Sequence, residues 1–253
     1  MIYLYIIIAL IGIAVGALTG ITGSSGVLIV VPALSLMGLG FKTAVGSSLL
    51  VDVITTIIVI YVYFKDKTLD FYTGIFMGLG AVIGAQIGTY IASMIDAFPL
   101  EIAFVVMTGY MSYYSMLRSF KKRSEISKKD LERKKALPIA MILSIPVGIL
   151  TGTIGTSGGV MFVFITMLLF NIPAQRMVGT ATLAMLLSAL SGVGGYIRIG
   201  HIDFIYSIII GGIALISGYY FSIIAHRIDE KYIYRSLSFV FMAVIITEAI
   251  KIV

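Results

Sequence analysis

Residues 16–34 read GALTGITGSSGVLIVVPAL, and residues 148–168 read GILTGTIGTSGGVMFVFITML. In both places glycine, serine and threonine interrupt a segment that is otherwise strongly apolar. Such flexible, polar backbone is tolerated inside a membrane only where protein or a wet cavity surrounds its N–H and C=O groups. The composition of the rest of the chain therefore decides what these two stretches are.

The composition is that of a membrane protein. The chain has 253 residues, of which 59% are hydrophobic and 12% are charged, whereas soluble domains carry about 25% charged residues. A soluble domain of this size leaves about a quarter of its surface exposed, so it could not hide so many apolar side chains. We therefore expect an all-α polytopic membrane protein.

Several function classes are disfavoured by what the chain lacks. It has no cysteine, and its two histidines, His201 and His226, do not form a metal-ligand pair at helical spacing. The chain also has no Gly-x-Ser-x-Gly motif with a distant histidine, no intramembrane aspartate pair and no His-Glu-x-x-His motif. We therefore expect no catalytic residue, metal or cofactor. The start lacks a basic n-region and a cleavage site, so we expect it to be a retained first membrane segment.

Ten apolar runs lie between charged or turn residues, and we expect about ten membrane segments. They are residues 2–21, 26–40, 44–64, 71–94, 99–117, 138–154, 158–171, 176–198, 204–225 and 233–252. A full helical crossing needs about 20 residues, so the second, sixth and seventh runs are short. The basic stretch RSFKKRSEISKKDLERKK (118–135) separates the halves, and the positive-inside rule places it in the cytoplasm, where anionic lipid is a further contact. The expected domains are a first membrane repeat (1–117), a linker (118–137) and a second membrane repeat (138–253).

The two halves repeat one another. Seven residues recur at an offset of 132, namely Gly16, Leu18, Thr19, Gly20, Gly23, Ser25 and Gly26, and later pairs such as Val45-Gly46 and Asp70-Phe71 recur at 133. Five segments per copy is an odd number, so the second copy would enter the membrane from the opposite side. Two topologies can be compared by the positive-inside rule: one in which all ten segments cross, and one in which the two segments around each glycine motif form a single broken crossing. The first places more basic residues on the same side of the membrane as the linker. The pattern predicts two inverted five-segment repeats with short or broken helices at the glycine motifs.

The glycine motifs are candidate anion sites. Ser24-Ser25 and Thr156-Ser157 precede new apolar runs and are suitable N-caps, and a helix start at membrane depth presents N–H donors to an anion. Two such starts brought together by an inverted repeat describe a midplane transport site. The candidate substrate-binding residues are Thr19, Gly20, Gly23, Ser24, Ser25 and Gly26 with Thr151, Gly152, Gly155, Thr156, Ser157 and Gly158. The alternative is close helix packing, which we favour for the ladder of Gly80, Gly84 and Gly88.

These motifs resemble a known family. The first copy has Gly16, Gly20, Gly23 and Gly26 at regular spacing, followed by Pro32. The related elements GSSL (46–49) and GTAT (179–182) follow the two copies of the motif, and the second copy comes after a basic linker. This arrangement is similar to that of the TauE/SafE family of sulfite and organosulfonate exporters, the 4-toluene sulfonate uptake permease group. The resemblance covers essentially the whole chain. It implies a multi-pass transporter of small sulfur-containing anions in a bacterial or archaeal plasma membrane. Family members often have three consecutive glycines where this chain has Ser24-Ser25-Gly26 and Thr156-Ser157-Gly158, which leaves the particular anion open.

Further polar residues lie inside or beside the apolar runs. Ser47 and Ser48, with Thr180 and Thr182 in the second copy, could complete the donor set or bond back to the i−4 carbonyl. Asp52, whose repeat partner is Met185, is the candidate for proton coupling, because an intramembrane carboxylate beside an anion site should be protonated. The alternative is that Asp52 makes a hydrogen bond to the Ser/Thr cluster.

Residues near the ends of the runs have plainer interpretations. Arg176 is the best basic candidate for the anion, although snorkelling to the interface is the more common role of such residues. Gln86 could join two helices. The tyrosines near run ends, including Tyr61, Tyr63, Tyr110, Tyr113 and Tyr220, fit an aromatic belt without a further role.

The leading hypothesis is alternating-access transport of a sulfur oxyanion at the paired motifs, coupled to protons through Asp52. A passive anion channel and a non-transporting membrane scaffold are the alternatives. The expected partners are a small anionic substrate and the lipid bilayer, and the sequence leaves room for a homodimer. Nucleic acid is not expected, because the net charge of +6 is concentrated in the linker.

Overall fold

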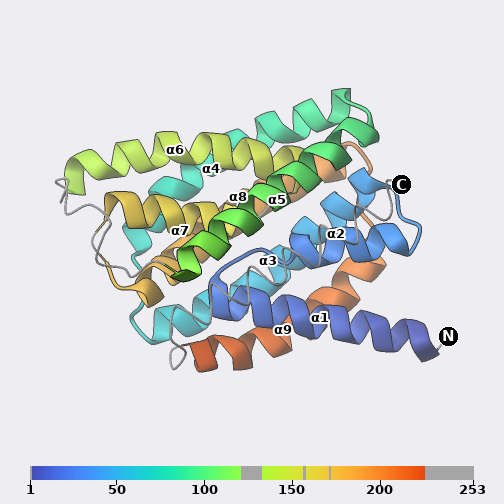
Figure 1. The fold of residues 1–253 in the computed structure, drawn as a ribbon, viewed down its shortest axis with the longest axis horizontal. Coiled ribbons are helices and arrows are strands. Elements are labelled where there is room, and N and C mark those ends of the chain that lie inside the picture. The colour runs from blue at the N-terminus through green and yellow to red at the C-terminus, as the bar shows by residue number, and fades with distance from the viewer. Residues whose placement is uncertain (1, 121–132, 156–157, 171, 226–253) are drawn as a thin grey trace.

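The computed structural model describes residues 2–120, 133–155, 158–170 and 172–225, and within these ranges the chain is helical without any strand (Figure 1). The described helices are α1 (Ile2–Thr22), α2 (Val27–Leu36), α3 (Phe41–Lys65), α4 (Phe71–Met94), α5 (Ala97–Phe120), α6 (Arg133–Ile154), α7 (Gly158–Leu169), α8 (Ala174–Arg198) and α9 (Phe204–Ala225). The expected tenth run, 233–252, lies outside the described residues.

Six of these helices are long and apolar enough to cross a membrane, namely α1, α3, α4, α6, α8 and α9. Helices α2 and α7 have 10 and 12 residues, so the second and seventh runs are short as predicted. The prediction that the sixth run is short is wrong, because α6 has 22 residues and begins at Arg133. Arginine, lysine and alanine are good helix formers, so the helix extends beyond the apolar residues that were counted.

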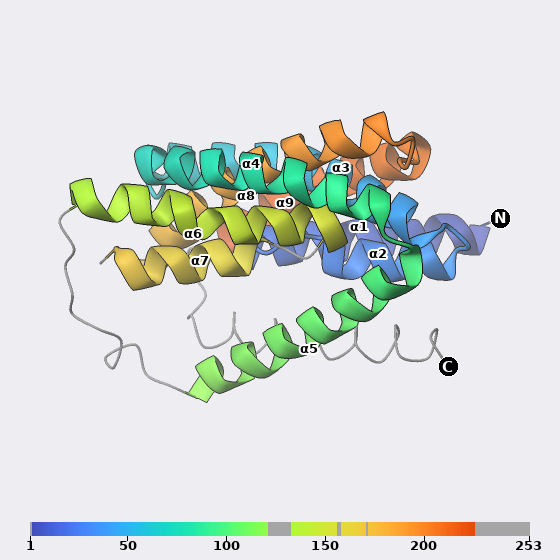
Figure 2. The ribbon, with the colours of Figure 1, turned by 90° about the horizontal axis from the view of Figure 1, so that it is seen from above.

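The long helices pack in pairs that join the two halves of the chain, with α4 against α6 and α1 against α9. Gly80, Gly84 and Gly88 of α4 lie directly against the backbone of α6 at Met141, Ile145 and Ile149. The predicted packing role of this glycine ladder is therefore confirmed. Figure 2 shows α5 diverging from the remaining helices.

Helices α3 and α8 run antiparallel. Gly46 near the start of α3 lies against Tyr196 near the end of α8, where an added Cβ would come within 2.9 Å of the ring. Gly179 near the start of α8 lies against Tyr63 near the end of α3, where a Cβ would come within 3.0 Å of the ring. The backbone carbonyls of His201 and Thr68 come closer still to the added Cβ. These contacts are related by the offset of 133, so the matched glycines are explained by a carbonyl and a tyrosine ring that leave no room for a side chain.

Candidate functional site

Each glycine motif ends a long helix in the same way. The Gly23 amide donates to the Thr19 carbonyl at 2.9 Å, and the Gly155 amide donates to the Thr151 carbonyl at 3.0 Å. Both glycines have a left-handed backbone, with φ of +65° and +69°, which L-residues adopt only at a cost. The chain then turns and starts the short helix α2 or α7.

The two turns touch one another. Gly159 at the start of α7 lies against the Gly23 carbonyl and Ser24, and a Cβ on Gly155 would come within 3.0 Å of the Val27 side chain at the start of α2. The starts of α2 and α7 therefore meet in the interior, where Ser24 and Ser25 are buried. Thr156 and Ser157 lie outside the described residues.

Asp52 of α3 reaches the first turn. Its buried carboxylate accepts a hydrogen bond from the Ser25 hydroxyl and another from the Gly26 amide, the latter at 2.7 Å. Ser25 Oγ in turn accepts from the Val27 amide at 3.1 Å. A carboxylate at a helix start is stabilised by the amides and by the helix dipole. The N-cap residue of α2 is Gly26 and not one of the serines that the sequence suggested, but Ser25 and Asp52 accept from the Val27 and Gly26 amides at the start of this helix.

Thr19 is a second buried polar residue beside the same turn, where its carbonyl accepts from the Gly23 amide. Its side chain is fully buried, and its hydroxyl has no hydrogen-bond partner within the described part of the chain. Val15 contacts Gly26, and residues four apart lie on one face of a helix, so Thr19 lies on the face of α1 that is turned toward the start of α2. Its counterpart Thr151 donates to the Val147 carbonyl at 3.0 Å.

The second turn has no equivalent of Asp52. Met185 occupies the matching position on α8, where it is buried in an apolar cluster with Phe162 and Ile165 of α7. Gly23 and Gly155 therefore share their backbone conformation and their hydrogen bond to the preceding helix, while the matching positions on α3 and α8 differ in charge.

Gly20 and Gly152 have a different place from the turns. An added Cβ on Gly20 would come within 2.9 Å of the Gly218 carbonyl in α9, and one on Gly152 would come within 2.9 Å of the Thr89 amide in α4. Both residues face a neighbouring helix and serve close packing. Gly158 begins α7 and is buried.

The hydroxyls at the starts of α3 and α8 bond elsewhere. Thr180 Oγ1 accepts from the Asp70 amide at 3.0 Å, and Ser47 Oγ accepts from the Asp203 amide at 2.8 Å, a matched pair across the two halves. Ser48 donates to the Val45 carbonyl, and Thr180 and Thr182 donate to their own i−4 carbonyls. For these two threonines the i−4 alternative is confirmed. Ser47, Ser48 and Thr180 are thus hydrogen-bonded to backbone groups. Thr182 lies beside the first turn, where an added Cβ on Gly23 would come within 3.1 Å of its Oγ1.

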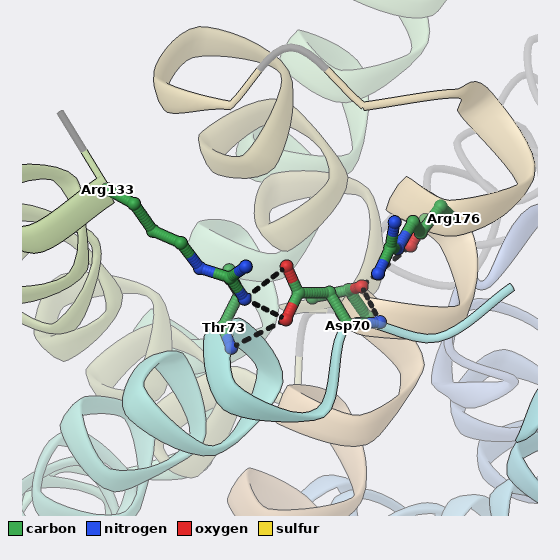
Figure 3. A network of polar contacts seen from close by, with 5 residues as sticks. Asp70, Thr73, Arg133 and Arg176 are labelled. Atoms are coloured by element: carbon green, nitrogen blue, oxygen red, sulfur yellow. Dashed lines mark hydrogen bonds and ion pairs between the residues drawn. The ribbon is translucent and has the colours of Figure 1, made fainter. Parts of the chain in front are cut away.

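Arg176 belongs to the polar network shown in Figure 3, where its carbonyl accepts from Thr180. The cation that pairs with Asp70 in this network is Arg133, which donates to both carboxylate oxygens at 2.6 and 2.9 Å. Asp70 also caps α4 by accepting from the Thr73 amide at 3.3 Å. The sequence singled out Asp70 through its match to Asp203, but Arg133 was assigned to the linker and missed.

Tyr63 was also missed. The belt interpretation is wrong for this residue, which is buried and donates its hydroxyl to the Gly20 carbonyl at 3.1 Å. Tyr61, Tyr110, Tyr113 and Tyr220 are exposed, as a belt requires. The available signal was the repeat itself, because Tyr63 matches the equally buried Tyr196 at the offset of 133.

Gln86 joins two helices, as one interpretation of the sequence predicted. Its side-chain amide donates to the Ser191 carbonyl at 2.7 Å and to the Ser191 hydroxyl at 2.9 Å, connecting α4 to α8. Throughout the described ranges no three His, Asp or Glu side chains come together in a way that could hold a metal ion.

Comparison with known proteins places this arrangement in context. A family model described as "Sulfite exporter TauE/SafE" matches residues 8–247. The chain is 26% identical over 239 residues to the probable membrane transporter protein YunE of Bacillus subtilis, covering 86% of this chain and 85% of that protein. It is 25% identical over 259 residues to the probable membrane transporter protein YjnA of the same organism, covering 97% and 98%. It is 25% identical over 209 residues to the probable membrane transporter protein MJ0441 of Methanocaldococcus jannaschii, covering 80% and 76%. No solved structure matches the chain.

Proposed function

Because the chain belongs to the sulfite exporter TauE/SafE family, we propose that it carries a small sulfur oxyanion, sulfite or an organosulfonate, through the site where its two glycine turns meet. Membership of the family makes it a multi-pass membrane transporter of a prokaryotic plasma membrane, and not an enzyme. The substrate class, the binding site and the coupling ion are the proposal.

One observation carries the site. The starts of α2 and α7 lie against each other in the protein interior, at Gly159 beside Gly23 and at Gly155 beside Val27. Each helix start is equivalent to about half a positive charge and presents N–H donors. Sulfite and sulfonates display three oxygens around one sulfur, and these accept hydrogen bonds from amides and hydroxyls such as those of Ser25 and Thr19.

We infer a ten-segment inverted repeat, with residues 1–117 and 138–253 as the two copies on either side of the 118–137 linker. The antiparallel course of α3 and α8 supports it. So do the matched contacts at offsets of 132 and 133, such as Thr180 with Asp70 and Ser47 with Asp203. Inverted repeats of this kind place a substrate site near the membrane midplane, where broken helices meet.

Asp52 is the proposed proton site. It is the one carboxylate at the meeting point of the turns in the described part of the chain, and it lies within a helix long enough to cross the membrane. Ionisable residues in such positions serve ion or proton pathways in many membrane proteins.

Flux in liposomes tests the proposal. Purified protein should take up sulfite and methanesulfonate with saturable kinetics, and uptake should respond to an imposed pH gradient. Conduction of many ions without saturation in planar bilayers would indicate a passive channel instead. Absence of flux for every sulfur oxyanion tried, in protein that remains folded, would contradict the substrate class.

A matched pair of variants tests the site. Ser25→Leu places a bulky apolar side chain at the first turn and removes one donor, so uptake should fall below detection. Ser93→Leu is the control, because Ser93 is exposed and donates to the Tyr90 carbonyl within its own helix. Full uptake in both variants would show that the substrate site lies elsewhere in the chain, whereas absence of uptake in wild type and in both variants would support the non-transporting scaffold.

A further inference from the structure

The centre of the molecule combines two positive helix ends with one negative side chain. Helices α2 and α7 both begin there, and the Asp52 carboxylate is the group that accepts from the Gly26 amide and the Ser25 hydroxyl. A negative group at paired helix starts is electrostatically favoured. In the structure, the protein's own carboxylate therefore holds donors that an anionic substrate would use.

We propose that ionised Asp52 is a tethered anion that competes with the substrate, so that the substrate anion binds only when Asp52 is protonated and the two move together. This inference rests on the proposed function and states how its binding site is regulated. The expected stoichiometry is one proton taken up for each anion bound.

Competition follows from the shared donors and from charge. A sulfonate at the start of α2 needs the Gly26 amide and the Ser25 hydroxyl, which Asp52 holds. Two unit negative charges about 5 Å apart repel strongly enough, at the effective dielectric of a protein interior, to weaken binding by 10- to 100-fold or more. Once Asp52 is neutral, that repulsion disappears.

The Thr19 hydroxyl indicates that the position suits something larger than a carboxylate. It is fully buried on the face of α1 turned toward the start of α2, and it has no partner in the described residues. Asp52 has two oxygens, and Ser25 and Gly26 serve both of them. A three-oxygen anion has one more acceptor, which the Thr19 hydroxyl can satisfy.

No other charged group in the described structure bonds Asp52. Helices α1, α2 and α9, which pack near or against α3, carry no Asp, Glu, Lys or Arg, and none of their tyrosines with a described side chain is buried. The charged residues with described side chains on the other two neighbours are Glu101 of α5 and Arg176 and Arg198 of α8, the latter two near the ends of that helix. The buried Tyr196 of α8 lies beside Gly46 at the start of α3. A proton on Asp52 is therefore the direct way to remove the negative charge.

Proton and charge balance follow. The proton enters from the water that reaches the open site, travels as the neutral acid of Asp52, and leaves on the other side when the anion departs. A monovalent anion plus one proton carries no net charge, so transport of methanesulfonate by the wild-type protein should be driven by a pH gradient and not by membrane potential. Replacing Asp52 by asparagine removes the proton and leaves one net negative charge per cycle.

Binding of methanesulfonate at different pH tests the inference, because this anion keeps its single charge between about pH 5 and pH 9. Wild-type affinity should rise tenfold for each unit by which the pH falls, over the range in which Asp52 titrates, as expected when one proton is taken up with each anion. Asp52→Asn should bind at alkaline pH about 10- to 100-fold more tightly than wild type, with no slope against pH. Asp70→Asn is the matched control, because Asp70 is the other buried aspartate among the residues that the structure describes but caps α4, and it should keep the wild-type slope.

Each result is decisive. A slope in Asp52→Asn equal to that of wild type overturns the tethered anion and leaves the transporter assignment intact. Absence of methanesulfonate and sulfite binding in both proteins at every pH overturns the inference and the proposed substrate together. If Asp52→Asn does not fold, the effect of membrane potential on wild-type uptake decides, because uptake that follows the potential at constant pH also overturns electroneutral movement.

Discussion

The two glycine turns begin with the same backbone conformation but meet different side chains from the helices packed around them. Gly23 and Gly155 share a left-handed backbone and the same hydrogen bond to the preceding helix. Asp52 caps the helix after the first turn, while Met185 fills the matching position with an apolar side chain. The left-handed glycine that ends the long helix is thus common to both halves, and the residue at the matching position of the packed helix differs in charge. If an anion must be balanced by a single proton, one carboxylate for two helix starts is the arrangement required.

The largest effect should come from making the turns alike. Met185→Asp buries a second carboxylate in an apolar cluster, which should lower the free energy of unfolding by about 3–5 kcal/mol and abolish methanesulfonate uptake. Thermal unfolding in detergent and uptake by liposomes would measure the two effects. Met185→Asn is the control without charge.

The double variant Asp52→Asn with Met185→Asp sharpens the same comparison. It moves the single carboxylate from the first turn to the second, so it should recover part of the stability and uptake that Met185→Asp loses. Recovery is expected because the repulsion between two carboxylates is removed. A double variant as inactive as the single one would show that the position of the charge matters, and not only its number.

A smaller and symmetric effect should follow from changes to the shared geometry. Gly23→Ala and Gly155→Ala each place a Cβ on a left-handed backbone, and the new Cβ would come within 2.9 Å of Val178 or Val45. Each should lower the free energy of unfolding by about 2–3 kcal/mol, as followed by thermal unfolding. Gly200→Ala isolates the backbone contribution, because Gly200 has φ of +72° but open space around it. Losses that differ widely between Gly23→Ala and Gly155→Ala would contradict the equivalence of the turns.

The sequence predicted where the backbone breaks and offered the Ser/Thr cluster as a hydrogen-bond partner of Asp52, which the bond from Ser25 confirms. It did not predict the bond from the Gly26 amide to Asp52, for a physical reason. Glycine and hydroxyl residues recurring at a constant offset identify where the backbone breaks, since that information is local. The bond from Asp52 to Gly26 joins residues 26 positions apart and depends on how α3 packs on α2. A hydroxyl residue next to a glycine did not predict a binding residue as well, because the hydroxyls of Ser47 and Thr180 accept hydrogen bonds from backbone amides of the opposite half.

The burial of Tyr63 could have been predicted from the sequence repeat. Its position near the end of an apolar run suggested the membrane interface. The match to Tyr196, together with the match of Gly46 to Gly179, already indicated a duplicated contact, because each tyrosine ring lies against the other half's glycine. Arg133 had no such signal, since its place relative to Asp70 depends on where α6 begins.

The tyrosine pair offers a third and smaller test. Tyr63→Phe removes a hydrogen bond of 3.1 Å to the Gly20 carbonyl, whereas Tyr196→Phe removes one of 3.4 Å to the Thr153 carbonyl. We expect Tyr63→Phe to cost about 1–2 kcal/mol of unfolding free energy and Tyr196→Phe about 0.5 kcal/mol, because the longer bond is weaker. Thermal unfolding would measure both, with the exposed Tyr61→Phe as control. An equal loss in the two variants would contradict the expectation that the shorter bond contributes more.

The smallest effect should come from the other asymmetric carboxylate. Asp70 and Asp203 cap α4 and α9 at matched positions, but the structure pairs only Asp70 with an arginine among the described residues. The Arg133 side chain is 55% exposed, so water and salt weaken the ion pair, and Arg133→Ala should cost about 0.5 kcal/mol or less. Thermal unfolding at low and high salt would measure it, and the loss should shrink as salt is added. Arg133→Lys, which keeps the charge, should lie between wild type and Arg133→Ala. A loss of several kcal/mol that persists at high salt would show that this ion pair is as central to the fold as the buried bonds of Asp52.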